Sequence, residues 1–302
     1  MSKNLESVIR DKLGEIFDMD NLYIICLQGT SGSGKTTYAN YLRDVLAKKK
    51  IDVYLIHIDS YFAFESGSLE DDPNFDFDNP GTIRWDILDT TLSDIINKKR
   101  TILVHNRSGD INEEKIANPG FKVLIIEGLY SFNCLGKKKF NIAEFDPKNS
   151  DKKIATEYIE NDNYKILSSN KSPYKDIKII NIRFLTCFTR LTSVRVQRDM
   201  IQLKLSFNEI YSRICNWIWP STVRWVFSNE FDCDIEIQHG NFNSGAIENL
   251  SDALFKFFKV GGEREKMKIA LDLNAFSCIK CLIGCDGVES NRSLYLKDNE
   301  NK

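Results

Sequence analysis

Hydrophobic positions early in the chain change from one spacing to another, and the change predicts a strand followed by a helix. Residues 22–27 form an almost continuous apolar run, which is typical of a strand buried on both faces. Tyr38, Leu42, Val45 and Leu46 then recur at the spacing of one face of an amphipathic helix. The first well-defined unit of the chain is therefore a strand, a short loop and a helix.

The same two patterns alternate further along the chain. Apolar, β-rich runs predict strands, and apolar residues at helical spacing predict helices. Strands are expected at residues 51–58, 121–128 and 179–185, and helices at residues 5–17 and 83–97. Strands that alternate with helices favour an α/β fold with a doubly wound parallel sheet, and that is the fold we expect.

Composition divides the chain into three parts, the second of which contains an insert. Residues 1–19 are predicted to form a leading helix, and residues 20–260 the main domain. Within that domain, residues 137–177 are rich in Lys, Asn, Asp and Ser without a sustained period, which predicts an inserted, mobile surface loop. Residues 261–302 form a C-terminal tail to which the sequence assigns no role.

The overall charge indicates a globular protein without affinity for large polyanions. The 302 residues are 42% hydrophobic and 28% charged, with a formal net charge of -2. This balance provides no positive field for nucleic acid or for an anionic membrane. No apolar stretch approaches the roughly 18 to 20 residues that span a bilayer. We therefore expect a cytoplasmic protein with neither a nucleic acid nor a membrane as partner.

The eight cysteines suit a reducing compartment, because most of them stand alone among apolar neighbours. Three are close together near the end of the chain, at Cys278, Cys281 and Cys285. They have the spacing of part of a metal site but no nearby fourth ligand. We do not expect them to bind a metal.

A phosphate-binding pattern, G-x-x-x-x-G-K-T, lies between the first strand and its helix. Its glycines let the loop turn so that backbone N–H groups point at a polyphosphate. Lys35 is expected to reach the β- and γ-phosphates, and the Thr36 hydroxyl to bind Mg²⁺. A glycine-rich turn that binds nothing is the alternative, and the flanking strand and helix argue against it. The loop consists of Gly29, Thr30, Ser31, Gly32, Ser33, Gly34, Lys35, Thr36 and Thr37.

Two acidic residues at the ends of predicted strands are expected near this loop. Asp59 follows the strand at residues 51–58, and Glu127 lies near the end of the strand at residues 121–128. Ligands in open parallel sheets bind beyond the carboxyl ends of the strands, so both side chains should face one crevice. Asp59 could accept a proton from an attacking hydroxyl, help to hold Mg²⁺, or only cap the next helix. Glu127 is expected to organise Mg²⁺.

Two histidines lie close to these acids in the sequence. His57 falls inside the strand at residues 51–58 and is interpreted as a packed strand residue rather than a catalytic base. His105 belongs to a short apolar segment, residues 101–107, that leads through a polar turn to the next strand. A lone histidine usually has a structural role.

Five short motifs, taken together, resemble the uridine-cytidine kinase branch of the uridine kinase and phosphoribulokinase superfamily. The family's signatures read as a phosphate-binding loop, D-S-F-Y, F-D-H-P, H-S-R and E-G-I. The resemblance covers about residues 20–258 outside the insert, and it implies a P-loop nucleoside-kinase type of fold with a helical lid. After the loop, the matching residues are Asp59-Ser60-Tyr61, Phe77-Asp78-Asn79-Pro80, His105-Asn106-Arg107 and Ile126-Glu127-Gly128.

The resemblance implies a role for each matching residue around the acceptor. Asp59 corresponds to the base that deprotonates the nucleoside 5′-hydroxyl, and Asp78 to the carboxylate that binds the ribose hydroxyls. Tyr61 and Phe77 correspond to aromatic walls around the nucleoside. His105 corresponds to a contact with the nucleobase.

The resemblance also extends to the metal and to the lid. Thr36 and Glu127 correspond to residues that organise Mg²⁺. Residues 190–199 are similar to a family helix with the pattern R-L-x-R-R-x-x-R-D. Arg195 and Arg198 share one face of that helix, where they are expected to balance charge on the transferred phosphoryl group. Surface salt bridges are the alternative for these two arginines.

The chain departs from the family just after this helix. The family continues with R-G-R-D, whereas Leu203, Lys204, Leu205 and Ser206 stand here. Two arginines and a glycine are therefore missing, and Lys204 is the positive charge that remains. Each lost charge-assisted contact would remove on the order of 2 to 4 kcal/mol of transition-state stabilisation.

These expectations describe a kinase that uses ATP and Mg²⁺ to phosphorylate the 5′-hydroxyl of a pyrimidine nucleoside, uridine or cytidine. One alternative is a kinase of the same superfamily that acts on another nucleoside or on a sugar phosphate. The other is a nucleotide-binding regulatory protein with weakened catalysis. The resemblance further implies a homo-oligomer, with the tetramer as the family's frequent form.

Overall fold

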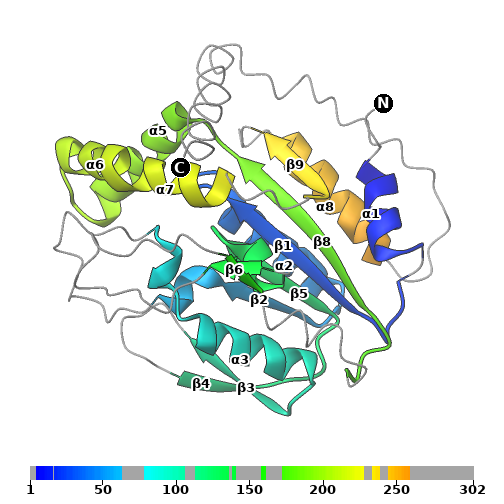
Figure 1. Cartoon of the computed structure of the whole chain (residues 1–302). Helices are drawn as coiled ribbons and strands as arrows, with labels where there is room; N and C mark the ends of the chain where they lie inside the picture. The colour runs from blue at the N-terminus through cyan, green and yellow to red at the C-terminus, as the bar shows by residue number, and fades with distance from the viewer. Residues whose placement is uncertain are drawn as a thin grey trace.

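A five-stranded parallel sheet in the order β2-β5-β1-β8-β9 forms the centre of the molecule (Figure 1). The computed structural model describes residues 5–15, 17–62, 78–105, 113–135, 138–140, 158–160, 172–227, 233–238 and 244–258. The strands are β1 (Leu22–Gly29), β2 (Val53–His57), β5 (Val123–Gly128), β8 (Ile177–Leu185) and β9 (Ile235–Gln238). Each strand predicted for the sheet from the apolar runs is present.

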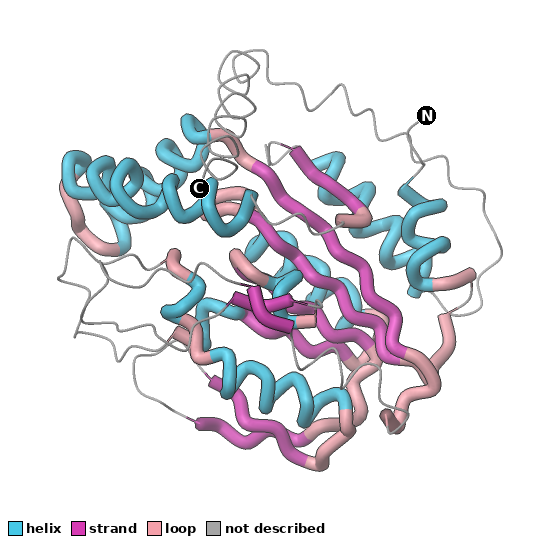
Figure 2. The backbone as a smooth tube through the Cα atoms, viewed as in Figure 1, coloured by secondary structure: helices cyan, strands magenta, loops and turns pink. Residues whose placement is uncertain are grey.

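Helices cover both faces of this sheet, as the tube in Figure 2 shows. One face carries α1 (Leu5–Leu13), α2 (Lys35–Lys48) and α8 (Ser244–Phe258). The other carries α3 (Trp85–Ile96). The expected α/β fold with a doubly wound parallel sheet is therefore confirmed.

The central strand β1 separates two hydrophobic cores. Ile24 and Cys26 face the core under α3, whereas Tyr23 and Ile25 face the core under the three other helices. Every residue of β1 is buried. A strand with apolar partners on both faces needs no alternation of polar residues, and this explains its unbroken apolar run.

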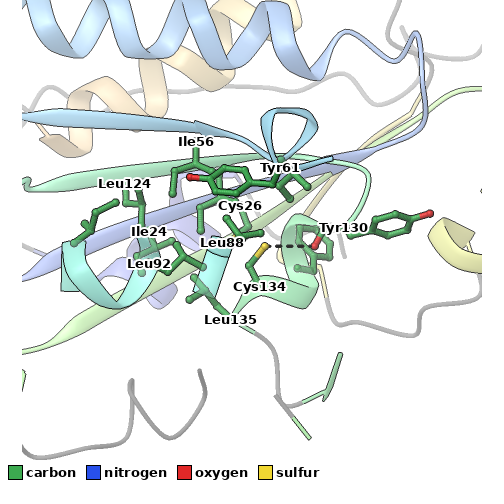
Figure 3. Packing of buried hydrophobic residues seen from close by; sticks show 14 of the residues in the cluster. Ile24, Cys26, Ile56, Tyr61, Leu88, Leu92, Leu124, Tyr130, Cys134 and Leu135 are labelled. Atoms are coloured by element: carbon green, nitrogen blue, oxygen red, sulfur yellow. Dashed lines mark hydrogen bonds between the residues drawn. The ribbon is translucent and has the colours of Figure 1, made fainter. Parts of the chain in front are cut away.

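The core on the α3 side extends to the carboxyl ends of the strands (Figure 3). Tyr61, which follows β2, packs there with Leu88 and Leu92 of α3. Cys134 lies in the same core and donates a hydrogen bond to the backbone oxygen of Tyr130 at 3.7 Å. Burial raises the pKa of the Cys134 thiol well above its ordinary value, so this cysteine stays protonated.

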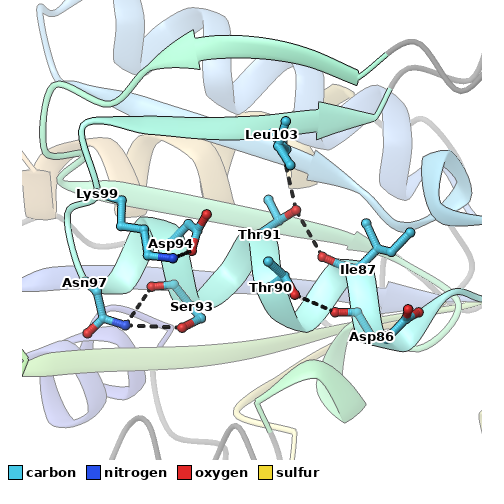
Figure 4. Close-up of polar contacts among 9 residues, drawn as sticks. All are labelled: Asp86, Ile87, Thr90, Thr91, Ser93, Asp94, Asn97, Lys99 and Leu103. Carbon is cyan, nitrogen blue, oxygen red and sulfur yellow. Dashed lines mark hydrogen bonds and ion pairs between the residues drawn. The ribbon is translucent and has the colours of Figure 1, made fainter.

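A short β-hairpin packs beside α3. It pairs β3 (Thr101–His105) with β4 (Glu113–Ala117) in antiparallel fashion. Thr91 Oγ1 lies 3.1 Å from the Ile87 carbonyl oxygen and 3.4 Å from that of Leu103, which ties α3 to β3 (Figure 4). The sequence predicted only a polar turn before β5. Three of the five residues of β4 are charged, so this strand has no apolar signal.

The segment expected to be an irregular insert contains two further short strands. β6 (Lys138–Phe140) and β7 (Tyr158–Glu160) pair with each other in antiparallel fashion. Near the end of the segment, the buried Tyr174 donates a hydrogen bond to the carbonyl oxygen of Phe121 at 2.7 Å. The tail at residues 261–302 lies outside the described residues.

A group of helices lies beyond the carboxyl ends of the strands, where the helical lid was predicted (Figure 1). It comprises α5 (Phe188–Gln202), α6 (Phe207–Arg213) and α7 (Trp219–Ser221), with π-helical turns at Ile214–Ile218 and Thr222–Phe227. We call residues 188–227 the lid. It has a small core of its own, built from Leu191, Ile210, Ile214 and Ile218. In the part of the chain that the structure describes, no helix has the length and apolar character needed to cross a membrane.

Candidate phosphate-binding site

Glycine is required at two places in the predicted phosphate-binding loop. Gly29, the last residue of β1, lies so close to β8 that an added Cβ would come within 2.4 Å of the Phe184 backbone oxygen. Gly34, immediately before α2, has φ of 90°, a left-handed conformation that other residues rarely adopt. The loop therefore turns tightly between the central strand and the helix, as its sequence predicts.

Several groups in this loop suit a bound oxyanion. α2 begins at Lys35 without a side-chain cap, so the partial positive charge of its N-terminus remains available. Lys35 itself is only 8% exposed. The buried hydroxyls of Thr30 and Ser33 have no hydrogen-bond partner among the described residues. A bound phosphate or water would satisfy such groups.

Thr36 and Glu127, the two residues predicted to organise Mg²⁺, lie side by side. Thr36 Oγ1 is 3.2 Å from both carboxylate oxygens of Glu127. His57 also contacts this carboxylate, because its Nδ1 lies 2.6 Å from Glu127 Oε1. Burial raises the pKa of Glu127, but the hydrogen bond from His57 and the charge of Lys35 lower it more, so the net pKa is below its usual value. Glu127 is therefore an ionised carboxylate at neutral pH.

This pair fits a magnesium ion that reaches the protein together with a phosphate. Mg²⁺ prefers oxygen ligands and keeps several waters, so one or two protein groups plus phosphate oxygens are sufficient. Thr36 and Glu127 supply one hydroxyl and one carboxylate. The described residues contain no group of three acidic, histidine or cysteine side chains that would form an all-protein metal site.

Asp59 and Asp78 share an electrostatic environment with cations of the loop and the lid. Asp59 lies just after β2, in the 3-10 helix Ile58–Tyr61, and Asp78 is 8% exposed. Burial raises the pKa of Asp78, and repulsion from Asp59 adds to the rise. Attraction to Arg195, Lys35 and Arg198 opposes it. Asp78 thus interacts with Lys35 of the loop, and both carboxylates interact with Arg195 of the lid.

The two predicted lid arginines are held by one buried acid. Arg195 Nε lies 3.3 Å from Asp199 Oδ2, and Arg198 Nε lies 2.7 Å from Asp199 Oδ1. Arg195 also reaches the loop, because its Nη1 donates a hydrogen bond to Ser31 Oγ at 3.1 Å. Arg195 therefore contacts the phosphate-binding loop, whereas Arg198, whose side chain is 39% exposed, pairs with its neighbour Asp199.

The remaining predicted site residues lie elsewhere or outside the described residues. Tyr61 is 4% exposed and belongs to the α3-side core, where burial raises its pKa to about 12. Thr37 is exposed on the first turn of α2. His105 ends β3, and the placement of its side chain is outside the description, as is the whole of Phe77.

Two residues of the site were not found from the sequence. His57 was interpreted as packing, yet it contacts Glu127. Asp199 was only the last letter of a family pattern, yet it pairs with both arginines. Their signals were positional: His57 ends a strand two residues before Asp59, and Asp199 stands four residues after Arg195.

The part of the chain that carries the loop matches the model of a known protein family. Residues 24–136 match the Phosphoribulokinase / Uridine kinase family. The predicted resemblance is thereby confirmed for this segment. It includes the loop, Asp59, Asp78 and Glu127, and it ends before the lid.

Individual relatives agree with this match. A uridine kinase of Ureaplasma parvum serovar 3 is 26% identical over 110 residues, which is 36% of this chain and 53% of that protein. The match thus spans about half the length of this relative. A uridine kinase of Limosilactobacillus reuteri is 25% identical over 231 residues, or 76% of this chain and 88% of the relative.

Among solved structures, a possible uridine kinase from Bacillus stearothermophilus resembles this chain with a TM-score of 0.41 and 14% sequence identity. The alignment covers 77% of this chain and 96% of that one. At this TM-score the likeness adds nothing to what the strand order and the helical layers already establish.

Proposed function

We propose that this chain is a kinase that uses ATP and Mg²⁺ to phosphorylate the 5′-hydroxyl of a pyrimidine nucleoside. The observation that carries the proposal is the grouping of Asp59, Asp78, Lys35 and the two lid arginines around one phosphate-binding loop. Loop amides and cations suit the phosphate donor, and carboxylates at the same edge suit a hydroxyl acceptor. The nucleoside itself is taken from the relatives, which are named uridine kinases.

Catalysis in such a site consists mainly of positioning and charge balance. Lys35 and the loop amides hold the triphosphate. Asp59 accepts the proton of the 5′-hydroxyl, whose oxygen forms the new bond to the γ-phosphorus while ADP departs. Mg²⁺ held by Thr36 and Glu127 would neutralise charge on the phosphate oxygens.

The remaining assignments around the acceptor are part of the same proposal. Asp78 would bind the ribose hydroxyls. The roles of Phe77 and His105 as contacts of the nucleoside stay predictions. A homo-oligomeric state and a cytoplasmic location also stay predictions.

The first test compares the wild type with Asp59→Asn. Radiolabelled ATP is supplied with uridine, cytidine, adenosine or a sugar phosphate, and transfer is followed for each acceptor. We expect transfer to uridine or cytidine, and a loss of about 10²- to 10⁴-fold in the variant because the general base is gone. ATP binding should survive the substitution. Full activity of Asp59→Asn would remove Asp59 from the role of base.

A second candidate function is a nucleotide-binding regulatory protein. The observation in its favour is the lid sequence at residues 203–205, which lacks the two arginines of the family pattern. Tight ATP binding without transfer to any of the four acceptors would support it. Transfer to the sugar phosphate alone would instead indicate another kinase of the same superfamily.

A further inference from the structure

The contact between His57 and Glu127 has no part in the mechanism above. His57 is the last residue of β2, and the parallel register places it directly beside Glu127 on β5. Side chains at paired positions of neighbouring strands point to the same face of a sheet. Both residues therefore project toward the α2 side, where Thr36 lies in the first turn of the helix.

The direction of this hydrogen bond follows from chemistry. A carboxylate is ionised at neutral pH and can then only accept hydrogen bonds. At 2.6 Å from Glu127 Oε1, His57 Nδ1 must then carry the proton and donate it. A hydrogen bond to an ionised acceptor at this distance is of the stronger, charge-assisted kind.

Such a bond restricts a side chain that would otherwise have several rotamers. A glutamate has three rotatable side-chain bonds, and holding it in one orientation costs conformational entropy. His57 fixes Oε1, and both oxygens then lie at equal distances from Thr36 Oγ1. The carboxylate is therefore already oriented toward the hydroxyl before a ligand arrives.

We propose that His57 is a positioning residue: its Nδ1–H holds the Glu127 carboxylate toward Thr36, in the orientation that a divalent cation bound with ATP requires. The inference rests on the proposed function, because it takes Thr36 and Glu127 as the residues that organise Mg²⁺. A residue that only fills space would be buried and would need no donor. The side chain of His57 is 32% exposed, which argues against that role.

The matched pair of variants is His57→Leu and His57→Asn. The Asn amide nitrogen is attached to Cγ, as Nδ1 is in histidine, so the second variant keeps a donor close to the original position. Leucine has a shape similar to that of asparagine but no hydrogen-bond donor. A difference between the two variants therefore reports the hydrogen bond and not the volume of the side chain.

The measurement is calorimetric titration of ATP into each protein, once with Mg²⁺ and once with EDTA, and without any nucleoside. Loss of a group that orients a metal ligand typically costs 10- to 100-fold in metal affinity. We expect His57→Leu to lose about that factor from the Mg²⁺-dependent gain in ATP affinity, while affinity in EDTA is unchanged. His57→Asn should remain close to the wild type.

A double substitution tests whether His57 acts through Glu127. Glu127→Gln alone should remove most of the Mg²⁺-dependent gain, and adding His57→Leu should remove no more, because both changes affect one unit. Additive losses would overturn the inference, as would equal behaviour of His57→Leu and the wild type. Equal losses in the leucine and asparagine variants would overturn it too, since they indicate packing.

Failure of the proposed function is distinguishable in the same experiment. A wild type whose ATP affinity gains nothing from Mg²⁺ would overturn both the kinase proposal and the role of His57. A wild type that shows the gain, lost in His57→Leu, but phosphorylates no nucleoside would support the positioning role and overturn only the proposed acceptor.

Discussion

At the scale of single residues, the close approach of Gly29 to β8 leads to a specific prediction. An alanine there would place Cβ 2.4 Å from the Phe184 backbone oxygen, which no side-chain movement can relieve. We expect Gly29→Ala to lower the free energy of unfolding by about 1 to 3 kcal/mol and to abolish tight ATP binding, because the loop must shift away from β8. Denaturant unfolding and calorimetry measure the two effects.

Gly14→Ala is the matched control for this variant. Gly14 has φ of +98°, and an added Cβ there would meet nothing within 4 Å. Its alanine variant should lose about 1 kcal/mol through backbone strain and keep its ATP affinity. Equal ATP affinities in Gly29→Ala and the wild type would show that the loop does not depend on its contact with β8.

The residues of the loop were predictable from the sequence, whereas the contact between His57 and Glu127 was not. The glycine spacing encodes the turn directly, and Asp59 and Glu127 follow from their positions at strand ends. His57 was missed because its role depends on the register between β2 and β5, which are separated by about 65 residues of chain. Apolar periodicity identifies strands but does not give the register between distant ones.

At the scale of elements, the turn between α5 and α6 contains a residue with an unusual backbone conformation. Lys204 has φ of 55°, a left-handed conformation, at the position where the family pattern has glycine. Ser206 then caps α6, and its backbone N–H bonds to Glu209 Oε2 at 2.7 Å in a capping box. This turn therefore holds a lysine in a backbone conformation that favours glycine.

Lys204→Gly should stabilise the protein by about 1 kcal/mol, because a left-handed conformation costs other residues roughly that amount. Chemical denaturation measures the gain. Lys204→Ala is the control, since it removes the charge but keeps the strain, and it should show no gain. A gain of the same size in the alanine variant would assign the effect to charge.

The elements that could not be predicted are those without apolar periodicity. β1, β5 and α3 have clear apolar signals and appear where expected. β4 is charged on three of five positions and is held by pairing with β3, a contact that local sequence does not encode. Because β4 lies at an edge, it buries little surface, and its sequence therefore has little hydrophobic pattern.

At the scale of the whole molecule, β1 links the nucleotide site to global stability. It lies between the two hydrophobic cores and ends in the phosphate-binding loop. A ligand that binds only the folded state stabilises it by mass action, by about 2.7 kcal/mol at 100 times its Kd. ATP with Mg²⁺ should therefore raise the unfolding midpoint, and EDTA should reduce the rise.

Lys35→Met provides the control for this prediction. It removes the buried cation of the loop and should leave the unfolding midpoint insensitive to ATP. Thermal unfolding across a series of ATP concentrations separates the outcomes. A rise in the midpoint of the variant equal to that of the wild type would show that ATP stabilises the fold from another place.

The charged residues between loop and lid have a consequence for the whole site. Among the described residues, three cations there stand near four carboxylates, so their formal charges leave no positive excess and do not act as an anion trap. Long-range attraction therefore contributes little to the approach of a nucleotide, and added salt has little to screen. The negative charge of a triphosphate must therefore be balanced at short range, by backbone dipoles and by the cation bound to the nucleotide. The seven residues are Lys35, Arg195, Arg198, Asp59, Asp78, Asp199 and Glu127.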